Sequence, residues 1–138
     1  MSDEAKKQLI RYLLEEAFAG NFTPLERHRG LHESIPMLRH LNENTSDRAL
    51  SFPFQFVAND WIVTVARRSY TSISPIFGFD AGQQQVTYDV LHFHHFDQEE
   101  IILEHLQALE MLRADRKSAL ETLSNIGTDD GVEHGLTN

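Results

Sequence analysis

The chain has 138 residues, 41% of them hydrophobic, and a formal net charge of −9, which suits a single domain with a core of its own. This negative charge disfavours nucleic acid and anionic membranes as partners, because both need a basic surface. The absence of cysteine excludes disulfides, thiolate zinc sites and a cysteine nucleophile.

The start of the chain favours a soluble cytoplasmic protein. Residues 1–18 are acidic and amphipathic, and they lack the basic start and the apolar core of a signal peptide. No apolar run in the sequence approaches the ~18 residues that a helix needs to span a membrane.

Two helices are expected first. Apolar residues recur at helical spacing over Asp3–Phe18, and Gly20 stands where a helix C-cap is expected. Thr23-Pro24-Leu25-Glu26 has the form of a capping box with proline at the first helical position. It predicts a short second helix that ends at Gly30.

A third helix is expected to begin after Ser34, which is a suitable N-cap, with Pro36 in its first turn. Leu38 and Leu41 have the spacing of its inward face. The polar residues 42–47 that follow predict a loop.

The pattern then changes to the period of two that is typical of β-strands. Leu50, Phe52, Phe54 and Phe56 alternate with smaller or polar residues, which predicts a strand with one strongly apolar face. Pro53 removes a ladder donor and indicates an edge strand or a bulge.

Three further strands and a helix complete the predicted domain. A turn at Asn59-Asp60 leads into a strand over 61–71, and a loop over 72–84 leads to the next strand. A turn over 97–100 then leads to a last strand over 101–108. A closing helix over 113–125 ends the single domain, residues 1–127, and residues 128–138 form a polar tail.

The strand over 86–96, VTYDVLHFHHF, contains three histidines. Side chains on a strand alternate between its faces, so His92 and His94 share a face and His95 points the other way. Polar groups among apolar ones are typical of the wall of a ligand pocket. The face with the two histidines consists of Val86, Tyr88, Val90, His92, His94 and Phe96.

Helices followed by antiparallel strands indicate an α+β fold with the helices on one face of a curved sheet. The segment VTYDVLHFHHF, followed by IILEH at 101–105, resembles "vtfegiDifRf" and "kIvEhw" of the SnoaL-like polyketide cyclases, in the nuclear transport factor 2-like superfamily. Residues 57–71 resemble the upstream "vadgdrVavrwtvtgth". The resemblance covers most of residues 5–112 and implies a cone-shaped antiparallel sheet packed against N-terminal helices.

The resemblance also points to one residue. The catalytic Asp of these cyclases, their acid/base in an aldol closure, aligns with His92, and their strand Arg aligns with His95. Another register would bring Asp89 to the acidic position, but Asp89 belongs to the opposite face. The chain also lacks a convincing counterpart of the small strand that the family has near residues 22–32.

Three interpretations of the histidines remain open at this stage. His92 is a general acid/base, with His94 beside it and Tyr88 as a hydroxyl donor. Alternatively the two histidines bind a metal, with a further donor from Glu104, His105 or His32. Or they form local hydrogen bonds and have no chemical role. We assign no metal ligands and expect no cofactor.

Arg67 and Arg68 face opposite sides of the second strand. If Arg68 points inward with Tyr70, it can bind a carboxylate or an enolate; otherwise it is a solvated or interface charge. Trp61 and the phenylalanines around Phe54 are expected to be core or pocket wall. The candidate binding residues are Tyr88, His94, Arg68, Tyr70, Trp61 and Phe54.

The sequence therefore predicts a protein that binds a small apolar or partly oxidised organic molecule between the sheet and the helices. Cofactor-free cyclisation, isomerisation, dehydration or hydrolysis by His92 is the sharper form of this prediction. A non-enzymatic ligand-binding or protein-interaction module is the alternative. The resemblance also implies a homodimer formed through the sheet.

Overall fold

The computed structural model describes residues 1–74 and 85–109 of the chain. The predicted closing helix over 113–125, the tail over 128–138 and most of the predicted loop over 72–84 lie outside these residues. The elements are the α-helices α1 (Asp3–Phe18) and α2 (Ile35–Glu43), the 3₁₀ helices η1 (Thr23–Arg27) and η2 (Arg29–Ser34), and the strands β1 (Thr45–Ala58), β2 (Trp61–Ser72), β3 (Gln85–Asp97) and β4 (Glu100–Leu109).

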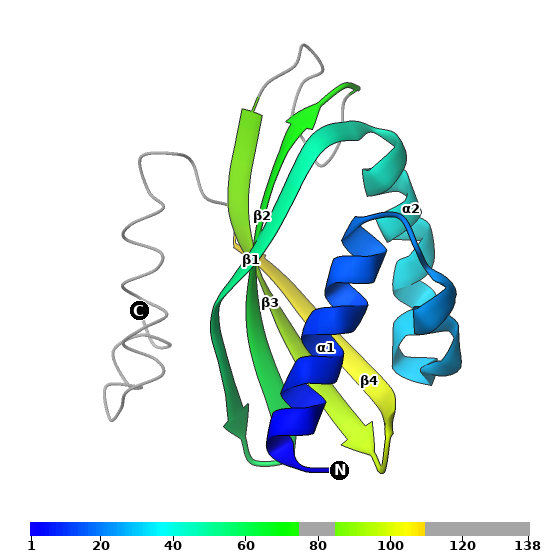
Figure 1. Cartoon of the computed structure of the whole chain (residues 1–138), viewed down its shortest axis with the longest axis vertical. Coiled ribbons are helices and arrows are strands. Elements are labelled where there is room, and N and C mark those ends of the chain that lie inside the picture. Colours follow the sequence, from blue (N-terminus) through cyan, green and yellow to red (C-terminus); the bar gives the residue numbers. More distant parts are fainter. Residues whose placement is uncertain (75–84, 110–138) are drawn as a thin grey trace.

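The four strands form one antiparallel sheet in the order β1-β2-β3-β4, and α1 and α2 cover one face of it (Figure 1). We call this covered face the inner face and the other the outer face. The predicted α+β architecture and its four strands are confirmed. The turns between β1 and β2 and between β3 and β4 contain Asn59 and Gln98, both with positive φ, a conformation that asparagine tolerates well.

Helix α1 has the predicted bounds because its two ends carry local signals. The hydroxyl of Ser2 accepts a hydrogen bond from the N–H of Ala5 at 3.1 Å, which caps the first turn. After the helix, Gly20 has φ of +98°, a conformation that costs glycine little. Apolar residues at helical spacing, including Ile10 and Leu13, are buried beneath the helix.

The predicted second helix is two 3₁₀ helices instead, η1 and η2. No side chain caps η1, and His28 has an extended conformation that separates the two. Gly30 packs tightly against β4: a Cβ there would lie 2.6 Å from the backbone nitrogen of Leu103. Close approach of η2 to the sheet therefore shapes this segment more than its capping pattern does. The third predicted helix is confirmed as α2, although the Ser34 hydroxyl donates to the carbonyl of Leu31 rather than capping it.

Strand β1 departs from its prediction at two places. It begins at Thr45, which pairs with Ser72, so the predicted loop over 42–47 is too long. A β-bulge between Ser51 and Phe54 then inserts one extra residue opposite β2, as Pro53 indicated.

After the bulge, the residues of β1 occupy the opposite faces to those that the alternation predicts. Gln55 is turned to the inner face, where it donates to the Lys7 carbonyl at 2.9 Å and to Thr64 Oγ1 at 3.0 Å. Phe54 is turned to the outer face and is 38% exposed. The prediction that residues 50, 52, 54 and 56 share one face is therefore wrong, because one inserted residue shifts a period of two by half a cycle.

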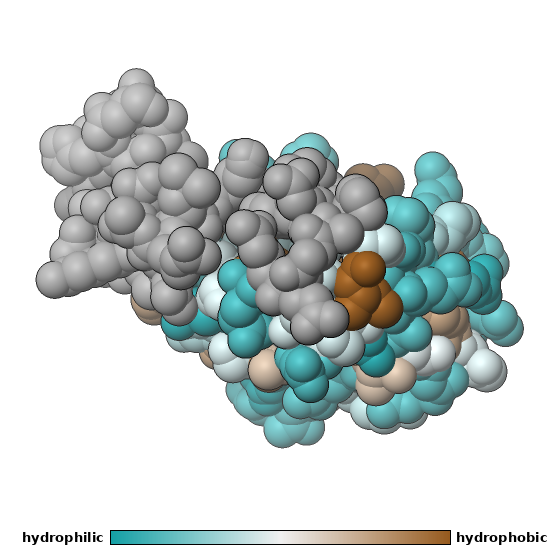
Figure 2. Space-filling model, turned by 90° about the horizontal axis from the view of Figure 1, so that it is seen from above, coloured by the Kyte–Doolittle hydropathy of each residue, from teal (hydrophilic) through white to brown (hydrophobic). Residues whose placement is uncertain are grey.

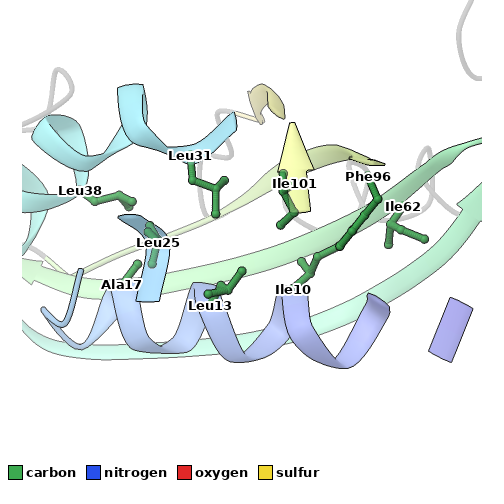
Figure 3. Close-up of a cluster of buried hydrophobic side chains, with 9 residues drawn as sticks. All are labelled: Ile10, Leu13, Ala17, Leu25, Leu31, Leu38, Ile62, Phe96 and Ile101. Atoms are coloured by element: carbon green, nitrogen blue, oxygen red, sulfur yellow. The ribbon is translucent and has the colours of Figure 1, made fainter. Parts of the chain in front are cut away.

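The main core lies between the inner face of the sheet and the helices (Figure 3). Figure 2 shows a predominantly hydrophilic described surface on its side of the molecule, in keeping with the acidic composition. No helix among the described residues is long and apolar enough to cross a membrane. The core cluster comprises Ile10, Leu13, Ala17, Leu25, Leu31, Leu38, Ile62, Phe96 and Ile101.

Candidate functional site

Three polar side chains gather inside this apolar core. His92 and His94 lie on β3, and Glu104 lies on β4 directly opposite His94. The two histidines are 2% and 1% exposed, and the carboxylate side chain is 6% exposed. The alternation of β3 brings both imidazoles to the inner face, as the sequence predicted, because no bulge interrupts the pairing of β3 with β2.

One carboxylate oxygen binds both imidazoles. Oε2 of Glu104 lies 3.0 Å from Nδ1 of His92 and 2.7 Å from Nε2 of His94. The two rings are stacked, with planes 12° apart and centroids 5.7 Å apart. The remaining ring nitrogens, His92 Nε2 and His94 Nδ1, are buried and have no hydrogen-bond partner in the described part of the chain.

The electrostatics of the cluster favour a carboxylate beside a neutral imidazole. Burial lowers the pKa of His92 to about 4, against the opposing effect of the bond to Glu104. Burial raises the pKa of Glu104, but the hydrogen bonds from His92 and His94 outweigh it and bring the pKa to about 2. At neutral pH, Nδ1 of His92 therefore donates its proton to Glu104, and Nε2 carries a lone pair.

A second group of polar residues lies further along the inner face. Arg68 of β2 stands opposite Tyr88 of β3 and is only 5% exposed. Its Nη1 lies 3.5 Å from the hydroxyl oxygen of Tyr88, and its guanidinium lies 6.0 Å from the centre of that ring. The Tyr70 hydroxyl donates to the Tyr88 hydroxyl at 2.9 Å. Burial raises the pKa of Tyr70, which keeps its hydroxyl protonated.

A small cavity joins the two groups. Its volume is about 10 Å³, close to the minimum that one water molecule requires. This is far smaller than a pocket for the small organic molecule that the sequence predicted. Its wall contains the polar residues Arg68, His92, His94 and Glu104, the apolar residues Ile10, Leu13, Leu14, Leu25, Leu31, Met37, Leu38, Ile101 and Leu106, and Ser34.

Two of the residues that the sequence assigned to the pocket lie elsewhere. Trp61 pairs with His95, and their rings meet edge to face with centroids 5.1 Å apart. His95 points away from His92, so Trp61 belongs to the outer face, as does Phe54 after the β1 bulge. Neither belongs to the candidate site, whereas Arg68, Tyr70 and Tyr88 lie on the same face as the histidines.

The sequence analysis did not identify Glu104 as the partner of His92. It named this residue only among further metal donors. Counting back across the 97–100 turn pairs Glu104 with Phe93, and only the β-bulge between His95 and Phe96 brings it opposite His94, so the sequence pattern alone did not place it at the site.

The same cluster has the composition of a metal site. One ligand atom from each of His92, His94 and Glu104 lies within 4.8 Å of the others, and two imidazoles with a carboxylate suit a divalent ion such as zinc. However, the positive charge of Arg68 acts on this cluster and contributes to the lowered pKa of His92. The same charge opposes a cation at this place.

A larger open hollow of about 500 Å³ lies at the turn between β3 and β4. The polar groups there have structural partners: Nδ1 of His28 accepts from the Ile101 N–H at 3.0 Å, and Glu100 accepts from Nε of Arg29 at 2.6 Å. These contacts fasten the 3₁₀ helices to β4, so we do not place the functional site here. The hollow is lined by Arg27, His28, Asp97, Gln98, Glu99 and Glu100.

Comparison of the sequence with protein-family models and with curated proteins finds no match. Solved structures, in contrast, are similar over most of the chain. TsrD from Streptomyces laurentii is 15% identical with a TM-score of 0.68, over 78% of this chain and 90% of that one. A SnoaL-like polyketide cyclase from Agrobacterium tumefaciens is 13% identical with a TM-score of 0.64, over 83% and 97%.

A nuclear transport factor 2-like protein of unknown function from Burkholderia pseudomallei is also similar, at 14% identity and a TM-score of 0.58, over 79% of this chain and 92% of that one. At these identities the similarity establishes the fold and leaves the chemistry to the site itself. The helices, the antiparallel sheet and these neighbours together confirm the architecture that the motifs indicated. The chain has the α+β fold of these SnoaL-like and nuclear transport factor 2-like structures.

Proposed function

We propose that the protein binds a small organic molecule between the sheet and the helices, and that His92 acts on this molecule or on a water beside it as a general base. One observation carries the proposal. Nδ1 of His92 is held by the buried carboxylate of Glu104, while Nε2 is buried beside a cavity without a hydrogen-bond partner among the described residues.

This arrangement is that of a base with its orienting group. A carboxylate that accepts from one ring nitrogen sets the tautomer and leaves the other nitrogen ready to accept a proton. When His92 takes a proton, the neighbouring charge of Glu104 stabilises the imidazolium. A placed base contributes roughly 100- to 10,000-fold to a rate, most where its pKa lies near the working pH, so the lowered pKa of His92 favours the lower end of this range.

His94 supports the same carboxylate from the other side. Its hydrogen bond at 2.7 Å and its stacking on His92 restrict how Glu104 and His92 can turn. We therefore assign His94 a positioning role and His92 the catalytic role.

The cavity limits which molecules the closed form accepts. With a volume of about 10 Å³ it has room for one water. An organic ligand needs the apolar wall to open, and Leu14, Met37 and Leu106 are half-buried side chains on that wall. Opening of α1 or α2 away from the sheet is thus part of the proposal.

The alternative is a non-enzymatic ligand-binding module. In that case the same cavity opens and binds the ligand, but His92 does not catalyse a reaction of it. A homodimer through the sheet and a cytoplasmic location, which the sequence analysis predicted, stay predictions.

The first test concerns the protonation of His92. Long-range ¹H–¹⁵N NMR spectra at pH 7 should show Nδ1 protonated and Nε2 unprotonated, and replacing Glu104 with Gln should redistribute the proton between them. A protonated Nε2 in the wild-type protein would exclude its role as a base.

The second test concerns turnover. We expect the protein to accelerate exchange of the α-protons of carbonyl probes (cyclohexanone, acetophenone and levulinate) for deuterium, followed by NMR in D₂O. His92→Gln should abolish the acceleration and Glu104→Gln should reduce it, while the exposed control His105→Gln should retain it. Binding of these probes without any exchange would favour the non-enzymatic module.

A further inference from the structure

We infer that Arg68 anchors an anionic oxygen, and that the ligand of the cavity is an organic carboxylate with an apolar body. The inference rests on the proposed function in one respect, since both place the ligand in the cavity beside His92. It adds the chemical class of the ligand, which the histidine cluster alone leaves open.

Among the described residues, the guanidinium of Arg68 is a buried charge without a counterion. The side chain is 5% exposed, and no carboxylate in the described part of the chain lies within ion-pair distance of it. Its contacts there are the long hydrogen bond to Tyr88 at 3.5 Å and the face of the same ring. Its neighbour Arg67, by contrast, pairs with the fully buried Asp89 at 2.9 Å on the outer face.

Such a charge is costly to bury. An ionised group that leaves water without a counterion destabilises the folded protein unless other groups solvate it. The guanidinium has five N–H donors, and the hydrogen bond that it forms among the described residues is the long one to Tyr88. Glu104 lines the same cavity, but its ion pairs in the described structure are with His92 and His94 and not with Arg68.

The unused donors are planar and fork-shaped, which matches the two oxygens of a carboxylate. Arg68 and His92 also line two adjoining cavities together. On the helix side, the walls of the two cavities are apolar, and Leu14 and Leu38 line both cavities. If the carboxylate of a ligand binds Arg68 and its carbon chain lies along this apolar wall, that chain extends toward Nε2 of His92.

The test uses a homologous series of probes: acetate, butyrate, hexanoate and octanoate, each with the alcohol of the same length. Binding is measured by the thermal midpoint of unfolding and by calorimetric titration. We expect at least one alkanoate to raise the Tm of the wild-type protein by about 5 °C near saturation. The alcohols, which lack the charge, should shift the Tm by less than half as much.

Variants then assign the effect to Arg68. Arg68→Met should weaken alkanoate binding at least tenfold, and Arg68→Lys should retain part of it. The matched control is Arg39→Met, because Arg39 is an exposed arginine on α2 that contacts only the ring of Phe22 in the described structure. It should bind alkanoates like the wild type.

The stability of Arg68→Met without ligand is an independent readout. Removing an uncompensated buried charge should leave the Tm unchanged or raise it by a few degrees, as for other sites where function opposes stability. A structural arginine would give the opposite sign. The inference is overturned if no alkanoate binds the wild-type protein more tightly than its alcohol, a result that needs no variant.

The outcome is separable from that of the proposed function. Alkanoate binding that depends on Arg68, together with no proton exchange by His92, would support this inference and refute catalysis. If exchange of the α-protons of neutral ketones survives Arg68→Met and no alkanoate binds, catalysis by His92 would be supported and this inference would be refuted.

Discussion

Nδ1 of His92 and Oε2 of Glu104 lie 3.0 Å apart on neighbouring strands, and both side chains are almost completely enclosed by the core. Because the same oxygen also accepts from His94, one carboxylate oxygen accepts a hydrogen bond from each of two buried imidazoles. This shared hydrogen-bond acceptor has measurable consequences for stability as well as for chemistry.

Replacing Glu104 with Ala should lower the free energy of unfolding by about 3 kcal/mol, since it leaves two buried ring N–H groups without an acceptor. Urea denaturation followed by circular dichroism measures the change. The control Glu15→Ala, at an exposed position of α1, should alter stability by less than about 0.5 kcal/mol. Equal losses in the two variants would contradict the assigned role of Glu104.

Acid should destabilise the protein in two steps. The pKa of His92 is lowered from 6.5 to about 4, so the unfolded chain takes up a proton first and stability falls between these pH values. The pKa of Glu104 is lowered from 4.5 to about 2, so a further loss follows between those values. His92 and Glu104 are hydrogen-bonded to each other, so the two losses belong to the pair and together amount to about a few kcal/mol.

Denaturation curves at pH 7, 5 and 3 test these steps. His92→Gln should flatten the upper step, and Glu104→Gln should flatten the lower one. His105→Gln, which replaces an exposed imidazole, should leave both steps in place. A wild-type protein equally stable at pH 7 and pH 3 would be incompatible with the lowered pKa values.

His28 should matter for stability although it lies outside the site. Its Nδ1 accepts from the N–H of Ile101 at 3.0 Å, and burial followed by the charge of Arg27 lowers its pKa. His28→Ala leaves that buried N–H unpaired and should cost about 1–3 kcal/mol. Amide hydrogen exchange at Ile101 should rise in the variant, while His105→Ala should leave it unchanged.

Gly30 should tolerate no side chain. A Cβ at this position would lie 2.6 Å from the backbone nitrogen of Leu103, and a strand backbone cannot move away cheaply. Gly30→Ala is therefore expected to cost about 1–3 kcal/mol through overpacking. Glu33→Ala, at an exposed position of the same 3₁₀ helix, is the control, and thermal unfolding of the two variants gives the comparison.

Much of the fold could be predicted because it depends on local signals. The bounds of α1 follow from apolar spacing together with Ser2 and Gly20 at its ends. Asn59 likewise predicted the turn between β1 and β2, and the alternation of residues predicted the two faces of β3. The η1 and η2 helices were not, since contact with β4 at Gly30 outweighed the capping pattern of the segment.

The site was predictable only in part. Alternation on one strand is enough to place His92 and His94 together and to turn His95 away. The face that Phe54 occupies, in contrast, depends on the β-bulge in β1. Pro53 indicates where this bulge lies, but only the pairing of β1 with β2 shows that it turns Phe54 to the outer face.

The sequence by itself determined the antiparallel α+β fold and the face that carries the two histidines, because helical and strand periods are properties of neighbouring residues. Only the tertiary structure decided that Glu104 joins His92 to His94, that Arg68 is buried without a counterion among the described residues, and that the cavity is about 10 Å³. These features depend on strand register and on how closely the helices pack, which residues distant in the sequence set together.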